Sequence, residues 1–179
     1  MKKVTRKTEE TEVFATFDAE KTEISTGIDF FDHMLQTIAK ISGYKIEVKA
    51  KGKDEHHVIE DVAICLGKSI AEIEKKGIDR FGFAIVPMDE SVATCALDFS
   101  GRGVFVFEGE LKDSGIRAED FLHFFDTLCR NSGLNVYLAV KGKNSHHMIE
   151  ACCKSFALAL KQALKKSGNE YRSAKGVLD

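Results

Sequence analysis

Apolar and polar positions alternate along the chain with two periods, which separate predicted strands from predicted helices. Residues 11–18 and 45–50 alternate with a period of two, as half-buried strands do. Residues 28–40 place apolar side chains at helical spacing on one face, and residues 57–75 do so again after a turn at Gly52. The rest of the chain repeats this pattern, with predicted strands at residues 81–88, 92–99, 104–111 and 134–141 and predicted helices at residues 118–130 and 146–166.

The repetition extends to individual residues at a fixed offset of 90. The register needs no gap from residue 31 to residue 76, and all six histidines of the chain occupy matched places, which indicates an internal duplication. We predict two halves, residues 1–78 and 79–179, packed as one compact unit and each built about as β-β-β-α-β-α. Sheets packed against helices give an α+β fold, a two-layer sandwich. The matched pairs are His33 and His123, His56 and His146, His57 and His147, and Glu60 and Glu150.

The most specific repeated motif is His-His-x-x-Glu, which stands at the predicted start of a helix in each half. Residues four apart share a helix face, so His56 faces Glu60, whereas the adjacent histidine points about 100° away and is expected to serve a different ion. Imidazole and carboxylate without thiolate suit Mn, Fe, Co, Ni or Zn. We predict two sites, each with three imidazoles and one carboxylate, which leave positions on the ion open for catalysis. The predicted ligands are His33, His56, His57, Glu60, His123, His146, His147 and Glu150.

Two interpretations without catalysis compete with a catalytic metal site. Histidines can be ordinary core or helix-start residues, as a lone histidine usually is. A metal that only staples the structure would use the same kinds of ligand with no open position. The repetition of the whole motif in a chain with six histidines argues against the first alternative, and the second stays open.

Composition narrows the class of protein. A net charge of −2 gives no general attraction to nucleic acid, so an anionic ligand must be held by local arginine or lysine side chains. No apolar run approaches the roughly 20 residues that cross a bilayer, and no apolar signal segment follows the charged N-terminus. The five cysteines are odd in number and form no CxxC pair, which indicates reduced thiols and a cytoplasmic location. We therefore expect neither a nucleic-acid nor a membrane partner.

Seven short motifs stand in order along the chain. They are TGIDFFDHML (26–35), HHVIED (56–61), RFG (80–82), PMDE (87–90), DFSGR (98–102), HFF (123–125) and NSHHMIEA (144–151). Together they closely resemble imidazoleglycerol-phosphate dehydratase of histidine biosynthesis. The resemblance runs from Arg6 to Leu178, and because no phosphatase domain accompanies it, the chain resembles the monofunctional form.

This resemblance implies an activity, a cofactor and an assembly. The activity is that of a carbon–oxygen lyase (a hydro-lyase), which converts D-erythro-imidazole glycerol phosphate to imidazole acetol phosphate. The cofactor is Mn²⁺, two ions per active site, bound by the eight residues given above. The implied fold is of the ribosomal protein S5 domain 2-like type, with active sites between subunits and trimers assembled into a 24-subunit shell. The expected partners are thus a small phosphorylated substrate and further copies of the chain.

Six further positions match substrate contacts of the family. Glu10 matches a substrate-contacting glutamate and is the leading candidate for proton transfer. The others are cationic or hydroxyl side chains suited to phosphate, because arginine can bind it in a bidentate manner and lysine supplies a compact charge. Residues 173–179 would then form a phosphate-binding tail of the second half. The predicted substrate contacts are Glu10, Arg80, Arg102, Lys154, Ser173 and Lys175.

The sequence departs from the family pattern near the expected substrate pocket. Thr37 stands where a glutamine is common, with Gln36 one position early, and Ile41 stands where a histidine is usual. Gly103 replaces the usual proline after Ser-Gly-Arg. These departures affect none of the eight predicted ligands. They make two other classes conceivable, a metal-dependent hydrolase of another phosphorylated compound and a metal-stapled oligomer, although the phosphate-binding residues argue against both.

Overall fold

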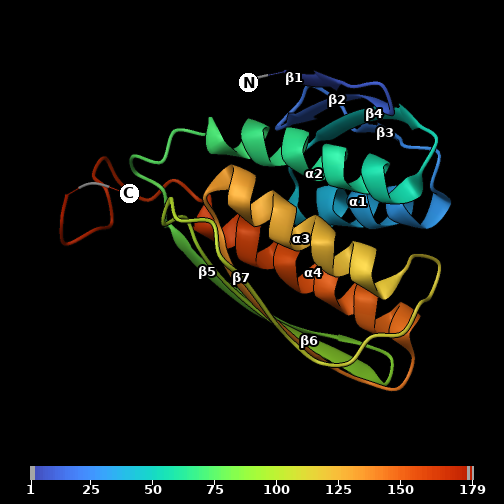
Figure 1. The fold of residues 1–179 in the computed structure, drawn as a ribbon. Helices are drawn as coiled ribbons and strands as arrows, with labels where there is room; N and C mark the ends of the chain where they lie inside the picture. The colour runs from blue at the N-terminus through green and yellow to red at the C-terminus, as the bar shows by residue number, and fades with distance from the viewer. Residues whose placement is uncertain (1–2, 177, 179) are drawn as a thin grey trace.

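The computed structural model of the chain describes residues 3–176 and residue 178. Within them the order of elements is β-β-β-α-β-α in each half, so the predicted α+β class is confirmed (Figure 1). The first half holds β1 (Val4–Lys7), β2 (Thr11–Phe17), β3 (Glu23–Ser25), α1 (Asp29–Ser42), β4 (Ile46–Gly52) and α2 (Glu55–Ala71). The second half holds β5 (Phe81–Met88), β6 (Ser91–Asp98), β7 (Phe105–Glu108), α3 (Ala118–Ser132), β8 (Asn135–Lys141) and α4 (Ser145–Ala163).

The two sheets have the same topology, which confirms the duplication. Their strand orders are β1-β2-β4-β3 and β5-β6-β8-β7, and β3 and β7 each run parallel to their neighbour. Val13 of β2 pairs with Ala50 of β4, and Ala93 of β6 pairs with Val140 of β8. The offset between halves is therefore 90 residues for β4 and β8 but 80 for β2 and β6. The second half has ten more residues between its second strand and its first helix.

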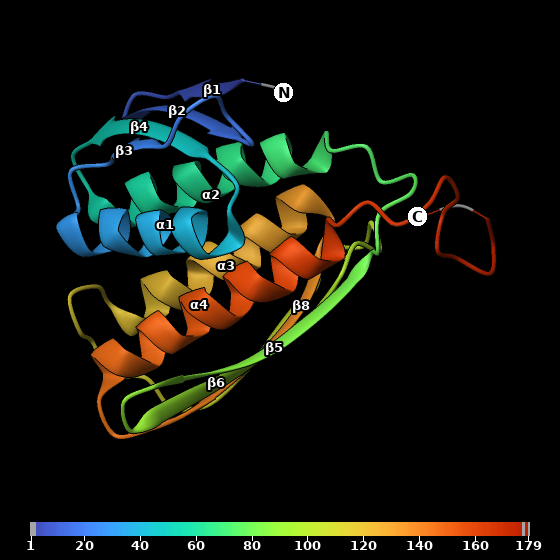
Figure 2. The same ribbon diagram turned by 180° about the vertical axis from the view of Figure 1, so that it is seen from behind.

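Each half is a two-layer unit, and the halves stack through their helices. One face of the first sheet is covered by α1 and α2, and one face of the second by α3 and α4 (Figures 1 and 2). Across the boundary, α2 packs against α3 and α1 against α4. The complete chain thus has four layers, sheet, helices, helices and sheet, with the boundary between the halves inside the helical region.

Aromatic side chains fill this helical boundary. The rings of Phe31 on α1 and Phe124 on α3 meet edge to face with centroids 5.2 Å apart, and both side chains are buried. Phe125 and Phe156 make a similar contact within the second half, at 5.1 Å. Burial of one such ring contributes roughly 1.5–3 kcal/mol to folding. The boundary is therefore part of the hydrophobic core, and it fixes how the two halves are oriented.

The helices that carry the His-His-x-x-Glu motif begin where the sequence predicts. The Asp54 side chain caps α2 by accepting a hydrogen bond from the backbone N–H of His57 (3.2 Å). The Asn144 side chain caps α4 by accepting from the backbone N–H of His146 (2.9 Å). Because each cap holds the first turn, it also sets the direction in which the histidines leave the helix.

Both helices end earlier than predicted. The last residues of α2 and α4 are Ala71 and Ala163, not residues 75 and 166. Beyond these points the two chain segments bond to each other, because Asp79 N donates to the carbonyl oxygen of Lys165 and Ser167 N donates to that of Gly77. Pairing between the segments replaces the last helical turn, a tertiary effect that helical periodicity does not register.

The structure also bears on the apolar segments and the cysteines of the chain. No helix among the described residues is long and apolar enough to span a membrane. All five cysteines are buried free thiols, as predicted. Burial raises the pKa of the Cys95 thiol to about 12, which keeps this side chain protonated near neutral pH.

Candidate metal centre

The first group of predicted ligands joins the two halves across the α2–α3 contact. We call it cluster A, and it consists of His56 and Glu60 from α2 and His123 from α3. The His123 Nε2 atom lies 3.4 Å from Glu60 Oε1, and the rings of His56 and His123 stack with centroids 4.9 Å apart. One ligand atom from each residue lies within 4.8 Å of the other two. Two imidazole nitrogens and a carboxylate oxygen therefore converge as a divalent metal ion requires.

The second group joins the halves across the α1–α4 contact. Cluster B consists of His33 from α1 and His146 and Glu150 from α4. Both histidines direct Nε2 toward the same carboxylate oxygen, Glu150 Oε1, at 3.7 Å for His33 and 3.2 Å for His146. Each cluster thus combines a histidine and the glutamate from the second helix of one half with the histidine on the first helix of the other half. This exchange across the boundary was not predicted from the sequence.

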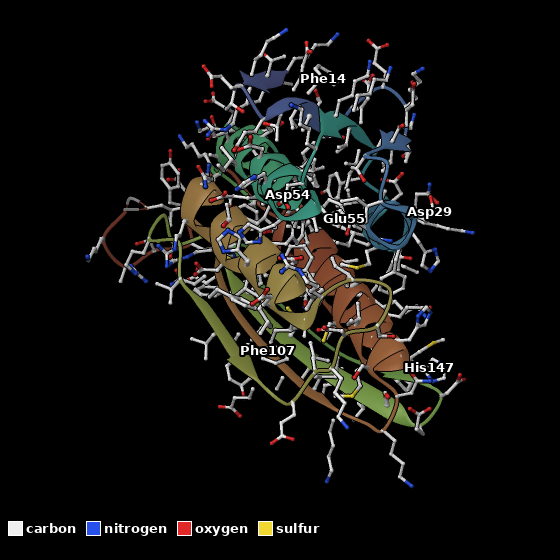
Figure 3. All side chains as sticks on the ribbon, turned by 45° about the vertical axis from the view of Figure 1, so that its right-hand side comes forward. Phe14, Asp29, Asp54, Glu55, Phe107 and His147 are labelled. Carbon is white, nitrogen blue, oxygen red and sulfur yellow. The ribbon has the colours of Figure 1, made fainter. Side chains whose placement is uncertain are left out.

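The second histidine of each motif points away from its cluster, as predicted. The His56 and His57 rings are inclined by 64° with centroids 5.8 Å apart, and those of His146 and His147 by 79° at 6.1 Å. Figure 3 shows His147 at the surface, where α4 begins. Within one chain each cluster therefore brings together two imidazoles and one carboxylate of the predicted three and one.

Each outward histidine meets a glutamate from its own half. The distance from His57 Nδ1 to Glu10 Oε2 is 3.3 Å, and from His147 Nδ1 to Glu90 Oε2 it is 2.9 Å. Glu10 and Glu90 are 80 residues apart, the offset of β2 and β6. The hydrogen bond from His147 lowers the pKa of Glu90 to about 2, and Asp89 stands beside the same imidazole, 3.5 Å from Nε2. Sequence analysis assigned Glu10 a role but missed Glu90.

A buried carboxylate, also missed, supports cluster A. Asp120 in the first turn of α3 is 1% exposed, and its Oδ1 accepts a hydrogen bond from His56 Nδ1 at 2.6 Å. Arg117 donates two hydrogen bonds to the same carboxylate, from Nε to Oδ2 (2.8 Å) and from Nη2 to Oδ1 (3.0 Å). Burial opposes ionisation of Asp120, but the hydrogen bonds from Arg117 and His56 outweigh it and lower its pKa. Asp120 is therefore a fixed anion beside the first histidine of the motif.

A lysine supports cluster B instead. Lys154 Nζ lies 3.0 Å from Glu150 Oε2, one turn further along the same face of α4. The same Nζ lies 3.0 Å from the sulfur of Met88. Burial opposes ionisation of Glu150, but Lys154 and the nearby histidines outweigh it and lower its pKa. Glu150 therefore keeps its negative charge in a mostly buried position.

The other predicted substrate contacts do not reach the clusters within one chain. Arg80 holds Asp98 with two hydrogen bonds (2.7 and 3.1 Å) and donates through Nη1 to the carbonyl oxygen of Arg172 (2.7 Å). In the same tail, Ser173 Oγ accepts from the backbone N–H of Lys175 at 3.2 Å. Residues 172–176 lie at the end of the molecule where α2 and α4 finish, opposite the end where these helices begin (Figures 1 and 2). Arg102 follows β6 in an exposed loop.

Comparison with known proteins places this geometry in a family. Residues 26–160 match the family model described as imidazoleglycerol-phosphate dehydratase. The chain is 65% identical over 179 residues to imidazoleglycerol-phosphate dehydratase of Archaeoglobus fulgidus, and each covers the other completely. It is 46% identical to the histidine biosynthesis bifunctional protein HisB of Stenotrophomonas maltophilia, where the match covers 98% of this chain but 52% of the relative.

A solved structure agrees with the fold. The crystal structure of IGPD from Pyrococcus furiosus in complex with (S)-C348 superposes with a TM-score of 0.90 at 31% identity, covering 98% of this chain and 100% of the other. The chain matches relatives of similar length over 100% and 95% of their sequences, as the monofunctional form of the enzyme does. This chain therefore belongs to the imidazoleglycerol-phosphate dehydratase family, the hydro-lyases that act in histidine biosynthesis.

Proposed function

We propose that the chain dehydrates D-erythro-imidazole glycerol phosphate to imidazole acetol phosphate with two Mn²⁺ ions per active site, in the cytoplasm. The observation that carries the metal part of this proposal is the convergence of two imidazoles and one carboxylate in both clusters. Nitrogen and carboxylate oxygen donors without thiolate suit Mn²⁺. Cluster A and cluster B would each hold one of the ions.

We assign the remaining ligands to neighbouring copies of the chain. His57 and His147 are partly exposed and point away from their own clusters, so each is positioned to complete a cluster of another subunit. The separation of the clusters from Arg80 and the tail supports the same arrangement, because one chain alone does not assemble all the predicted contacts. The expected assembly is a set of trimers that form a 24-subunit shell.

An apolar surface supports this self-association. On the outer face of the second sheet, Phe83 and Ile85 of β5 are 71% and 69% exposed. The matching face of the first sheet is charged, with Lys49 of β4 paired to Glu23 of β3 at 2.9 Å. Exposed apolar patches mark interaction surfaces, so we assign the outer face of the second sheet to a contact between copies.

The chemistry requires removal of a proton from carbon that is not next to a carbonyl group. The anionic imidazole ring can expel the hydroxyl from the carbon that carries the ring, and this hydroxyl takes up a proton and leaves as water. The next carbon then loses its proton to give the enol, which becomes imidazole acetol phosphate. Bound Mn²⁺ would supply positive charge at the ring nitrogens and so favour the anionic ring. Glu10 is the residue to which we assign proton transfer, because its carboxylate is held beside His57 while its side chain remains 65% exposed.

The phosphate group needs fixed positive charge at a distance from the reacting carbon. Arg80 presents a guanidinium that Asp98 holds in place, and Lys154 places an ammonium beside cluster B. We assign phosphate binding to these groups together with Arg102, Ser173 and Lys175. Arginine and lysine then contribute as they do in other phosphate sites, by bidentate and point-charge contacts.

One assay tests this proposal. Purified chain is stripped of metal, loaded with Mn²⁺ and given imidazole glycerol phosphate, and the formation of imidazole acetol phosphate is followed with metal content measured on the same sample. We expect turnover that depends on Mn²⁺ and reaches its maximum at two ions per chain. Absence of turnover with the correct stereoisomer and full metal loading would rule out the proposed reaction, and a maximum at one ion would rule out the dinuclear site.

A further inference from the structure

The duplication provides an internal control for the surroundings of each cluster. His56 and His146 occupy matched positions, and the residue beside each of them also comes from matched positions of α3 and α1, Asp120 and Phe30, which are 90 residues apart. In cluster A this neighbour is a carboxylate, whereas in cluster B it is an aromatic ring whose centroid lies 4.7 Å from that of His146. The two clusters therefore have the same types of predicted ligand, but a different residue contacts the first histidine of the motif in each.

The carboxylate beside His56 is fully engaged. Asp120 accepts from His56 through Oδ1 and from Arg117 through both oxygens, and it is 1% exposed. A buried carboxylate without partners would be strongly destabilised in its ionised form, so the guanidinium of Arg117 is what allows Asp120 to stay ionised there. Since an ionised carboxylate only accepts hydrogen bonds, His56 must carry its proton on Nδ1.

This proton position determines which nitrogen is available to a metal. With Nδ1 protonated, His56 offers its lone pair at Nε2, and the short hydrogen bond also fixes the plane of the ring. Phe30 presents no lone pair, so it packs on His146 without selecting a tautomer. His56 of cluster A is thus held in one tautomer and one ring orientation. In cluster B the corresponding neighbour of His146, Phe30, supplies only van der Waals contact.

We propose that Asp120, held by Arg117, is a positioning residue that makes cluster A the preorganised and tighter of the two Mn²⁺ sites. This inference rests on the proposed two-metal function. The two clusters have matching ligand types, yet their Mn²⁺ affinities should be unequal. Hydrogen-bonded carboxylates behind metal-binding histidines typically change metal affinity about 10–100-fold when they are removed.

Stepwise titration of the metal-free, full-length chain with Mn²⁺ tests the proposal. We expect two binding steps in the unmodified chain, and in Asp120→Asn the tighter step should weaken about 10–100-fold while the other changes less than about threefold. Asp120→Glu keeps the charge and should recover part of the affinity. Phe30→Leu is the matched variant in cluster B and should leave the tighter step unchanged. Arg117→Lys keeps a positive charge but loses the two-point contact with Asp120, so it should also weaken the tighter step and serves as the second variant if Asp120→Asn does not fold.

The outcomes separate this inference from the proposed function. Equal effects of Asp120→Asn on both steps, or no effect on either in a folded protein, would overturn the positioning role. If Asp120→Asn does not fold, an unchanged tighter step in Arg117→Lys would overturn it in the same way. If the unmodified chain binds two ions in unequal steps yet does not turn over imidazole glycerol phosphate, the proposed reaction fails while the inference about Asp120 stands. If it turns over substrate and the variants bind Mn²⁺ as it does, only the inference fails.

Discussion

Clusters A and B occupy matched positions of the two halves, yet their environments differ. In cluster A the proposed carboxylate ligand, Glu60, is 38% exposed, and Asp120 lies behind His56. In cluster B the proposed carboxylate ligand, Glu150, is 13% exposed, and Lys154 pairs with it. The position that corresponds to Lys154 in the first half is Ile64, which carries no charge. The two halves thus have the same histidine and glutamate residues in their clusters but different residues next to them.

The difference suggests a division of labour between the clusters. A lysine beside a metal site can hold an anionic substrate there, whereas a buried carboxylate behind a histidine stabilises the metal itself. We therefore expect a change at Lys154 to act mainly on the substrate, and changes in the support of cluster A to act mainly on metal affinity. Three further pairs of variants can break or sharpen this comparison.

The largest effect is expected when the two carboxylate ligands are neutralised in turn. Glu150→Gln and Glu60→Gln should each lose one ion and lower kcat/KM by more than about 100-fold, roughly 2.7 kcal/mol of transition-state stabilisation. Glu150→Gln also leaves Lys154 without its anion, so its metal-free Tm should fall about 2–4 °C further than that of Glu60→Gln. Metal analysis, subunit count by light scattering and calorimetry measure these effects. Glu150→Gln should also weaken assembly, so retained metal and an unchanged subunit count in this variant would contradict a metal site that a neighbouring subunit completes.

An intermediate effect is expected at the lysine that distinguishes cluster B. Lys154→Met removes a charge-assisted contact to substrate, so kcat/KM should fall about 10–100-fold while two Mn²⁺ ions remain bound. Ile64→Met, at the matched position of the first half, should change neither quantity. Steady-state kinetics with metal analysis decides the point. A loss of metal in Lys154→Met would mean that the lysine supports the ligand Glu150 and not the substrate.

The smallest effect is expected at the glycine that packs against Phe30. Gly115 has a φ of +72°, and an added Cβ would lie 2.7 Å from Cγ of Phe30. Gly115→Ala should cost about 1 kcal/mol of stability and, by moving Phe30 against His146, weaken Mn²⁺ binding at cluster B a few-fold. Gly168→Ala, where no atom lies within 4 Å of the added carbon, is the control. Denaturant unfolding and Mn²⁺ titration give the result, and weakening confined to cluster A would contradict it.

Local periodicity was sufficient to predict much of this molecule. The order of helices and strands, the start of α2 and α4 at the paired histidines, and the divergence of neighbouring imidazoles all follow from spacing along one helix or strand. The family could be recognised from ordered motifs. These features depend on residues close in sequence, which is why no tertiary information was needed.

The remainder depends on contacts between distant segments. Asp120 reaches His56 across the boundary between the halves, and its matched residue is Phe30, so a search for repeated positions passes over it. Glu90 repeats Glu10 at an offset of 80 residues, and a comparison at 90 residues therefore misses the relation. The position of Arg80 and the tail away from the clusters likewise follows only from how the four layers stack.

The exchange of histidines between the halves also has an evolutionary consequence. An isolated half offers one histidine–glutamate pair on its second helix and one histidine on its first, but the pair and the single histidine belong to different clusters, so one half completes neither. Two identical copies of such a half, packed helix to helix about a twofold axis, would form both clusters at once by symmetry. The present chain thus has, within a single polypeptide, the arrangement that fusion of such a symmetric dimer would give.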